Sequence, residues 1–114
     1  MSLTEPLYQV DVEQRLEILM QRLESEVERY ASLSVESAEL EADYKRKYHR
    51  TVLQSVNGTV AQKEAAAHLN AAKEFRQWKI VEAQLRATQQ ALIALRTQIE
   101  TNRTISANVR ASGG

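Results

Sequence analysis

The residues best suited to chemistry in this 114-residue chain are four cations and two tyrosines that share one short stretch. The stretch, called the basic-aromatic segment below, is Tyr44-Lys45-Arg46-Lys47-Tyr48-His49-Arg50. Lysine and arginine neutralise phosphates and release counterions, and aromatic rings offer a surface on which any nucleobase can stack. The segment therefore indicates a surface for single-stranded nucleic acid. The residues predicted to neutralise phosphate are Lys45, Arg46, Lys47 and Arg50, and those predicted to stack on bases are Tyr44 and Tyr48. Lys63 is predicted to extend the surface beyond the next turn.

Other interpretations of the basic-aromatic segment stay open. Cations near the end of a helix also stabilise the helix dipole, and Tyr44 and Tyr48 lie on an apolar stripe where they can be ordinary core residues. The same cations also suit an acidic protein partner, or they simply form a solvated surface.

The sequence lacks the residue patterns typical of enzymes. It has no cysteine, no Gly-rich phosphate loop and no Ser-His-Asp arrangement. His49 and His68 lie on either side of an interior turn and can approach each other, but no third ligand accompanies them in a spaced motif. We therefore predict that the chain is not an enzyme and carries no metal and no cofactor.

Two long helices are expected to position these residues. The only strong interior breaker is Asn57-Gly58, and Thr59 with Gln62 reads as a capping box that opens a second helix from about Val60 to Ile105. The predicted packed stripe of the first helix is Val12, Leu16, Met20, Leu23, Val27, Tyr30, Ser34 and Ala38, continued by Tyr44, Tyr48 and Val52. That of the second helix is Ala67, Ala71, Trp78, Val81, Leu85, Leu92, Leu95 and Ile99.

The predicted fold class is all-α, a long antiparallel two-helix hairpin that resembles a coiled coil. A single hairpin domain is expected over residues 12–110 with its turn near residues 57–59, a lead-in over residues 1–11 and a disordered tail over residues 111–114. Folding about the turn places Leu16 opposite Ile99 and Trp78 near Ser37. Residues 1–43 hold eleven acids and three bases, and residues 44–114 hold twelve bases and four acids. The two helices are therefore expected to neutralise each other.

A second row of small and apolar residues on the second helix needs its own cover. This row, called the alanine row below, is Ala65, Leu69, Ala72, Ile80, Ala83, Ala87, Ala91 and Ala94. A lone hairpin rarely buries enough area to offset chain entropy, so we predict a homo-oligomer. A monomeric bundle, with the first helix broken near Ser32-Leu33-Ser34, is the alternative.

No run of about 18 apolar residues and no secretory signal is visible in the sequence, which predicts a soluble, cytoplasmic protein without a membrane partner.

The whole pattern over about residues 12–110 resembles small helical phage proteins, and in particular is similar to the UvsY-like recombination mediators. The likeness rests on the acidic first helix, on Asp43-Tyr44-Lys45-Arg46-Lys47-Tyr48, on Asn57-Gly58-Thr59, on the charged stretch from Lys63 to Trp78 and on a closing segment from Ala94-Leu95-Arg96 to Asn108-Val109-Arg110. The resemblance implies an oligomeric accessory factor, located in the host cytoplasm, that binds single-stranded DNA through Lys45, Arg46 and Lys47. It also implies a recombinase or a single-strand binding protein as partner. The rival prediction is a structural or adaptor coiled-coil protein that acts through helix contacts without nucleic acid.

Overall fold

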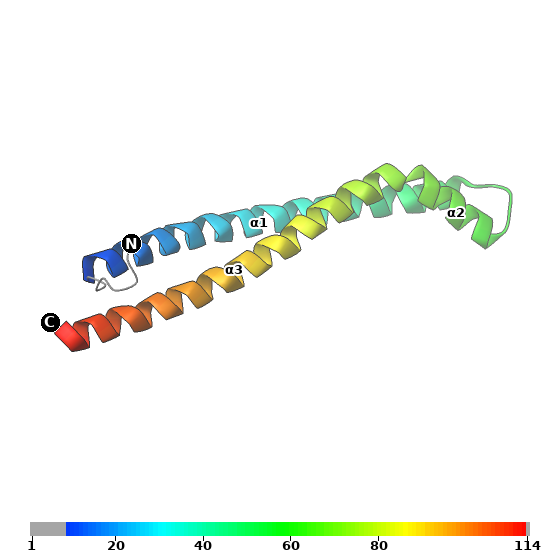
Figure 1. Ribbon diagram of the computed structural model, residues 1–114. Helices are drawn as coiled ribbons and strands as arrows, with labels where there is room; N and C mark the ends of the chain where they lie inside the picture. Colours follow the sequence, from blue (N-terminus) through cyan, green and yellow to red (C-terminus); the bar gives the residue numbers. More distant parts are fainter. Residues whose placement is uncertain (1–8, 114) are drawn as a thin grey trace. The chain divides into compact units, whose positions relative to one another are not determined.

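The computed structural model describes residues 9–113, and within this range the chain is helical with no strand. Its helices are α1 (Gln9–Gln54), α2 (Val60–Asn70) and α3 (Ala72–Gly113) (Figure 1). The all-α prediction is confirmed. The second predicted helix, however, is interrupted at Ala71 and extends beyond Ile105.

The helices contribute to two compact units. The single domain predicted over residues 12–110 stays a prediction. Unit 1 contains the described residues up to Arg29 together with those from Thr88 onward, and unit 2 contains Tyr30–Ala87. The predicted borders also shift, because residues 9–11 of the expected lead-in belong to α1 and residues 111–113 of the expected disordered tail belong to α3. Residues 1–8 and Gly114 lie outside the described residues.

Leucine and isoleucine side chains hold α1 against α3 in unit 1. Leu19, Leu95 and Ile99 are buried together, and Leu16 and Leu23 pack against them. Further along the same helices, the Gln9 side-chain amide donates a hydrogen bond of 3.0 Å to the Ser106 hydroxyl. The residue numbers rise along α1 as they fall along α3, so the two helices run antiparallel in this unit.

The packed stripe of α1 differs from the predicted stripe. Met20 and Val27 are 47% and 48% exposed, and Ala38 is exposed too, whereas Leu19 and Leu33 are buried. The buried and half-buried positions alternate in steps of three and four residues: Val12, Leu16, Leu19, Leu23, Glu26, Tyr30, Leu33, Ser37, Leu40 and Tyr44. This period of about 3.6 residues keeps one side of a helix facing a partner helix, whereas the longer predicted period drifts around the surface. The predicted stripe of the second helix is buried or half-buried throughout.

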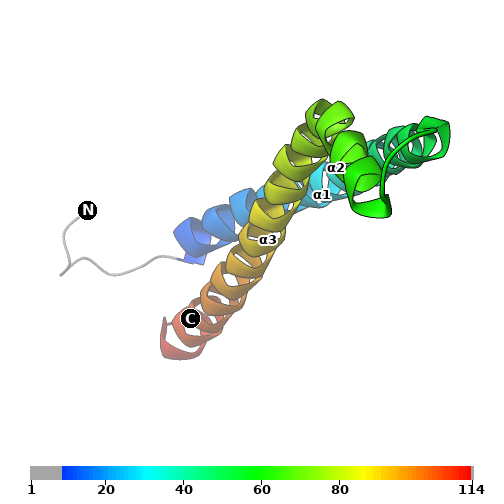
Figure 2. The same cartoon turned by 90° about the vertical axis from the view of Figure 1, so that its right-hand side faces the viewer.

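The connection between α1 and α2 follows the sequence closely. Gly58 has a φ of 110°, a value that favours glycine, and the Thr59 hydroxyl accepts a 3.2 Å hydrogen bond from the Gln62 backbone N–H. The Gln62 side chain in turn accepts a 3.0 Å hydrogen bond from the Thr59 N–H, so the predicted capping box is confirmed. Figure 2 shows the chain leaving α1, reversing its direction and entering α2. In unit 2 the amide of Asn70 donates to the Thr51 hydroxyl at 2.9 Å, which ties the end of α2 to α1.

None of the helices over residues 9–113 combines the length and the apolar character that crossing a lipid bilayer requires.

We predict that Leu95→Ala destabilises the protein by about 2–5 kcal/mol, because Leu95 is only 3% exposed and its truncation leaves a cavity in the unit 1 core. The measurement is the free energy of unfolding from urea denaturation followed by far-ultraviolet circular dichroism. Ile93→Ala is the matched control, since Ile93 lies on the same helix but is 51% exposed, and its effect should stay below about 1 kcal/mol. Equal losses from the two variants would contradict the assigned core.

Candidate nucleic-acid interface

All seven predicted site residues lie in unit 2. Six of them follow one another on the last turns of α1, and Lys63 lies in the first turn of α2. A seven-residue stretch of α-helix makes nearly two turns, so its side chains point in several directions around the helix axis. The side chains of the basic-aromatic segment therefore lie on two sides of the seam, which is the line along which α1 packs against α2 and α3 in unit 2.

One side of the seam is a polar groove, with a volume of about 560 Å³, between α1 and the α2–α3 segment. Its lining residues are Asp43, Arg46, Lys47, Arg50, Thr51, Gln54, Asn70, Glu74 and Gln77. Three of the four predicted phosphate-binding cations thus share one open groove, together with side-chain amides that donate hydrogen bonds. No aromatic side chain lines it.

Two of the groove cations have carboxylate partners. The Lys47 ammonium lies 2.9 Å from Glu74 Oε1 and so joins α1 to α3. The Arg46 guanidinium lies 3.2 Å from Asp43 Oδ1, three residues earlier on the same helix. Arg50 is exposed and has no ion pair within residues 9–113. The groove therefore offers one unpaired guanidinium and two cations that an incoming anion would share with carboxylates.

The hydrogen bond from Lys47 holds the pKa of the Glu74 carboxyl below its ordinary value of 4.5, and a backbone hydrogen bond lowers that pKa further. Glu74 is therefore a carboxylate at neutral pH. Its second oxygen, Oε2, is buried and has no hydrogen-bond partner in the described part of the chain.

The other side of the seam is an aromatic cluster, formed by Tyr44, Tyr48, His68, Phe75 and Trp78. Tyr44 lies at its centre: the ring stacks on Trp78 with centroids 5.8 Å apart and contacts Phe75 at 5.2 Å. Its hydroxyl lies 3.1 Å from His68 Nδ1. Tyr44 is half-buried among these rings, so a nucleobase would have to displace one of them to stack on it.

Tyr48 occupies the edge of the aromatic cluster. It is half-buried, its ring lies 5.9 Å from Tyr44, and His49 meets it edge to face at 5.3 Å. Burial raises the pKa of the Tyr48 hydroxyl, and the nearby negative charge of Glu64 raises it further. Across the cluster, the Lys79 ammonium lies over the Trp78 ring at 4.3 Å.

The remaining predicted cations lie outside the polar groove. Lys45 forms a 2.8 Å ion pair with Glu41 one turn earlier, and Lys63 is half-buried in α2. Sequence reasoning missed the α2–α3 side of the groove, which is Asn70, Glu74 and Gln77. Their spacing of four and three residues was the available signal, because in the continuous helix predicted from the sequence it places all three side chains on one face across the turn from the cations.

The helix-dipole interpretation of the basic-aromatic segment finds little support in the geometry. The last turn of α1 contains no basic residue, because the helix continues to Gln54 beyond Arg50. Interactions with the helix dipole fall off within the final turn, so these cations lie too early to benefit strongly.

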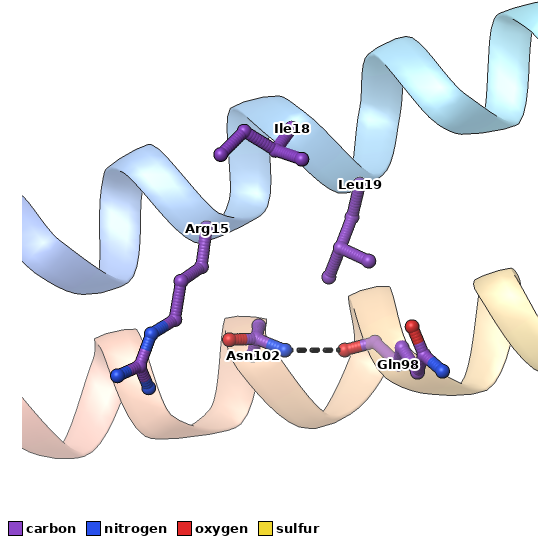
Figure 3. Close-up of a pocket in the computed structure, with 5 residues that line it drawn as sticks. All are labelled: Arg15, Ile18, Leu19, Gln98 and Asn102. Carbon is purple, nitrogen blue, oxygen red and sulfur yellow. Dashed lines mark hydrogen bonds between the residues drawn. The ribbon is translucent and has the colours of Figure 1, made fainter.

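Two other kinds of site are less well supported than the polar groove. Within residues 9–113, no group of three or more histidine, aspartate or glutamate side chains could hold a metal ion. Unit 1 has a smaller hollow of about 290 Å³, where Arg15, Ile18 and Leu19 of α1 lie across from Gln98 and Asn102 of α3 (Figure 3). The Asn102 amide donates to the Gln98 carbonyl of its own helix at 2.8 Å. With one charged residue, this hollow is a weaker candidate than the polar groove.

Comparison of the chain with protein-family models, curated proteins and solved structures finds no match. The side chains of unit 2 are therefore the basis on which a function can be proposed.

We predict that the Lys47–Glu74 ion pair stabilises unit 2 above about pH 4.5 and that this contribution is lost in acid. The folded-state pKa of Glu74 lies below 4.5, so the stabilisation disappears as the pH falls through that lowered value. Glu74→Gln should lower the thermal midpoint at about pH 7, and its difference from the unmodified protein should shrink between about pH 5 and about pH 3. Circular dichroism melts over this range test the prediction, and a difference that stays constant with pH would contradict it.

Proposed function

We propose that this chain is a non-enzymatic accessory protein that binds single-stranded DNA through the polar groove of unit 2 and assists recombination or replication in the manner of a recombination mediator. The observation that supports this most is the gathering of Arg46, Lys47 and Arg50 in one open groove with amide donors. Guanidinium groups match phosphate with two parallel hydrogen bonds, and amides add neutral donors.

The spacing of the groove cations suits neighbouring phosphates of a single strand. Arg46 and Arg50 are one helical turn apart, about 6 Å along the axis, and so can contact neighbouring phosphates of one flexible strand. Because the Tyr44 ring is enclosed by the aromatic cluster, the binding free energy comes mainly from phosphate contacts. Binding is then tolerant of sequence and weakens steeply with salt.

The proposed function includes the long antiparallel hairpin and its assembly into a homo-oligomer. Within unit 1 the core contacts of α1 with α3 run antiparallel, and within unit 2 the contacts Thr51–Asn70 and Lys47–Glu74 also follow an antiparallel order; each supports the hairpin. Exposure of the alanine row, in which Leu69 is 79% and Ile80 is 49% exposed, supports assembly. An oligomer would repeat the groove and raise the affinity for a long strand by avidity. A recombinase or a single-strand binding protein remains the proposed protein partner.

The same exposed residues favour a second candidate function, that of a structural or adaptor coiled-coil protein. In this case the alanine row binds another helix, and the groove cations only keep the surface hydrated. The two functions differ in one simple observable, which is affinity for single-stranded DNA at about 0.15 M salt.

We predict that the double variant Arg46→Gln with Arg50→Gln lowers the affinity for single-stranded DNA about tenfold or more at about 0.15 M salt, because two phosphate contacts are lost. The slope of log K against log salt should become less steep by about 1.4, at about 0.7 per contact. Fluorescence anisotropy of a labelled oligonucleotide over a salt series measures both quantities. Lys45→Gln with Lys63→Gln is the matched control, since it removes the same two charges at predicted residues outside the groove, and an equal loss there would contradict the groove as the site.

We predict that Ile80→Asp reduces the assembly state without unfolding the chain, because it places a charge on an exposed apolar position of the alanine row. Light scattering coupled to size-exclusion chromatography gives the mass, and circular dichroism reports helicity. Gln89→Asp adds the same charge at an exposed position of α3 outside the row. A mass that is the same for all three proteins would contradict assembly through this row.

A further inference from the structure

Glu74 occupies an unusual place in the polar groove. Its Oε1 accepts the 2.9 Å hydrogen bond of Lys47 from the opposite helix, and its side chain is only 23% exposed. Its Oε2 is buried without a hydrogen-bond partner in the described residues. The carboxylate thus depends on Lys47 for the side-chain contact that compensates its charge.

A phosphate that binds in the groove must compete with this carboxylate. If the phosphate takes the Lys47 ammonium, Glu74 loses its cation and keeps a poorly hydrated negative charge beside a second one. Removal of one partner from a partly buried ion pair is costly, because the charge that stays behind has little access to water.

The Arg46–Asp43 pair does not present the same obstacle. It joins two residues of the same helix turn, and its side chains are 62% and 53% exposed. Water can replace either partner there, so such a pair contributes little free energy. The cost of admitting an anion is therefore concentrated at Glu74.

We propose, resting on the function proposed above, that Glu74 is a specificity-determining residue that competes with phosphate for Lys47 and so restricts the groove to ligands carrying several phosphates. A single phosphate group gains one or two contacts and must displace Glu74. A strand of several nucleotides also engages Arg46 and Arg50, and these contacts offset the displacement. A single phosphate is thereby left with too little affinity to occupy the groove, whereas an oligonucleotide keeps enough to bind.

The test compares Glu74→Gln with the unmodified full-length protein in anisotropy titrations of two labelled oligothymidylates, one of about 4 and one of about 15 nucleotides. Glu74→Gln removes the competing charge but keeps the side-chain size. We expect about three- to tenfold tighter binding of both strands, because Lys47 becomes free and the same displacement cost disappears for each. The slope of log K against log salt should steepen by about 0.7, since one more cation releases its counterion on binding.

Glu36→Gln is the matched control. It makes the same change in net charge within unit 2, but Glu36 is exposed and does not line the polar groove. Its affinities should stay within about twofold of those of the unmodified protein, because a single distant charge is largely screened at physiological salt. Circular dichroism of every variant establishes that the helices are retained.

Each outcome of this experiment decides something. Binding by the unmodified protein with no gain in Glu74→Gln overturns the role of Glu74 and leaves the proposed function standing. Weaker binding by Glu74→Gln shows that Glu74 positions Lys47 for the ligand, which also overturns the inference. A gain that Glu36→Gln reproduces reflects net charge and counts against it. Absence of binding by every protein at low salt overturns the proposed function itself.

Discussion

The constraint on which both units depend is that paired helices touch along one seam. A seam needs buried positions in alternating steps of three and four residues, and α1 keeps this alternation from Val12 to Tyr44. In unit 1 the seam is made of leucine and isoleucine. In unit 2 the same alternation brings Tyr44, Lys47, Glu74 and Trp78 to the interface. The candidate site is thus a stretch of seam in which aromatic and charged residues occupy the kind of position that leucine and isoleucine occupy in unit 1.

Aromatic and charged residues at these positions lower the stability that the seam of unit 2 can supply. The Lys47–Glu74 pair must compensate the partial dehydration of two charges, and the Trp78 Nε1 is buried without a hydrogen-bond partner among the described residues. Apolar residues of similar size at these positions would have no such cost. Departures from a locally favourable sequence are expected where function is located, and unit 2 has several of them within two helical turns.

Local signals in the sequence are sufficient to predict the helices and the turn between them, because the Thr59 capping box and Gly58 act within a few residues. The break at Ala71 and the division into two units have no comparable local signal, since alanine is a good helix former. The rotation of α1 was harder still. The predicted stripe advances by about 3.7 residues per step and so includes Met20 and Val27. The buried positions advance by about 3.6 residues per step and so include Leu19 and Leu33. The cations of the site were predictable, but their separation from the tyrosines depends on that rotation, and Glu74 depends on the partner helix.

The structure also changes the interpretation of the uneven distribution of charge along the sequence, because it shows where the ion pairs form. The acidic first part and the basic second part were expected to neutralise each other across the helix pair. Ion pairs at Lys45, Arg46, Lys79, Arg86 and Arg103 instead join neighbouring turns of one helix. Such local pairs, most of whose side chains are exposed, are each worth little. The Lys47–Glu74 pair joins two helices and is less exposed to water, so under the proposed function its strength would set the threshold that a phosphate ligand must exceed.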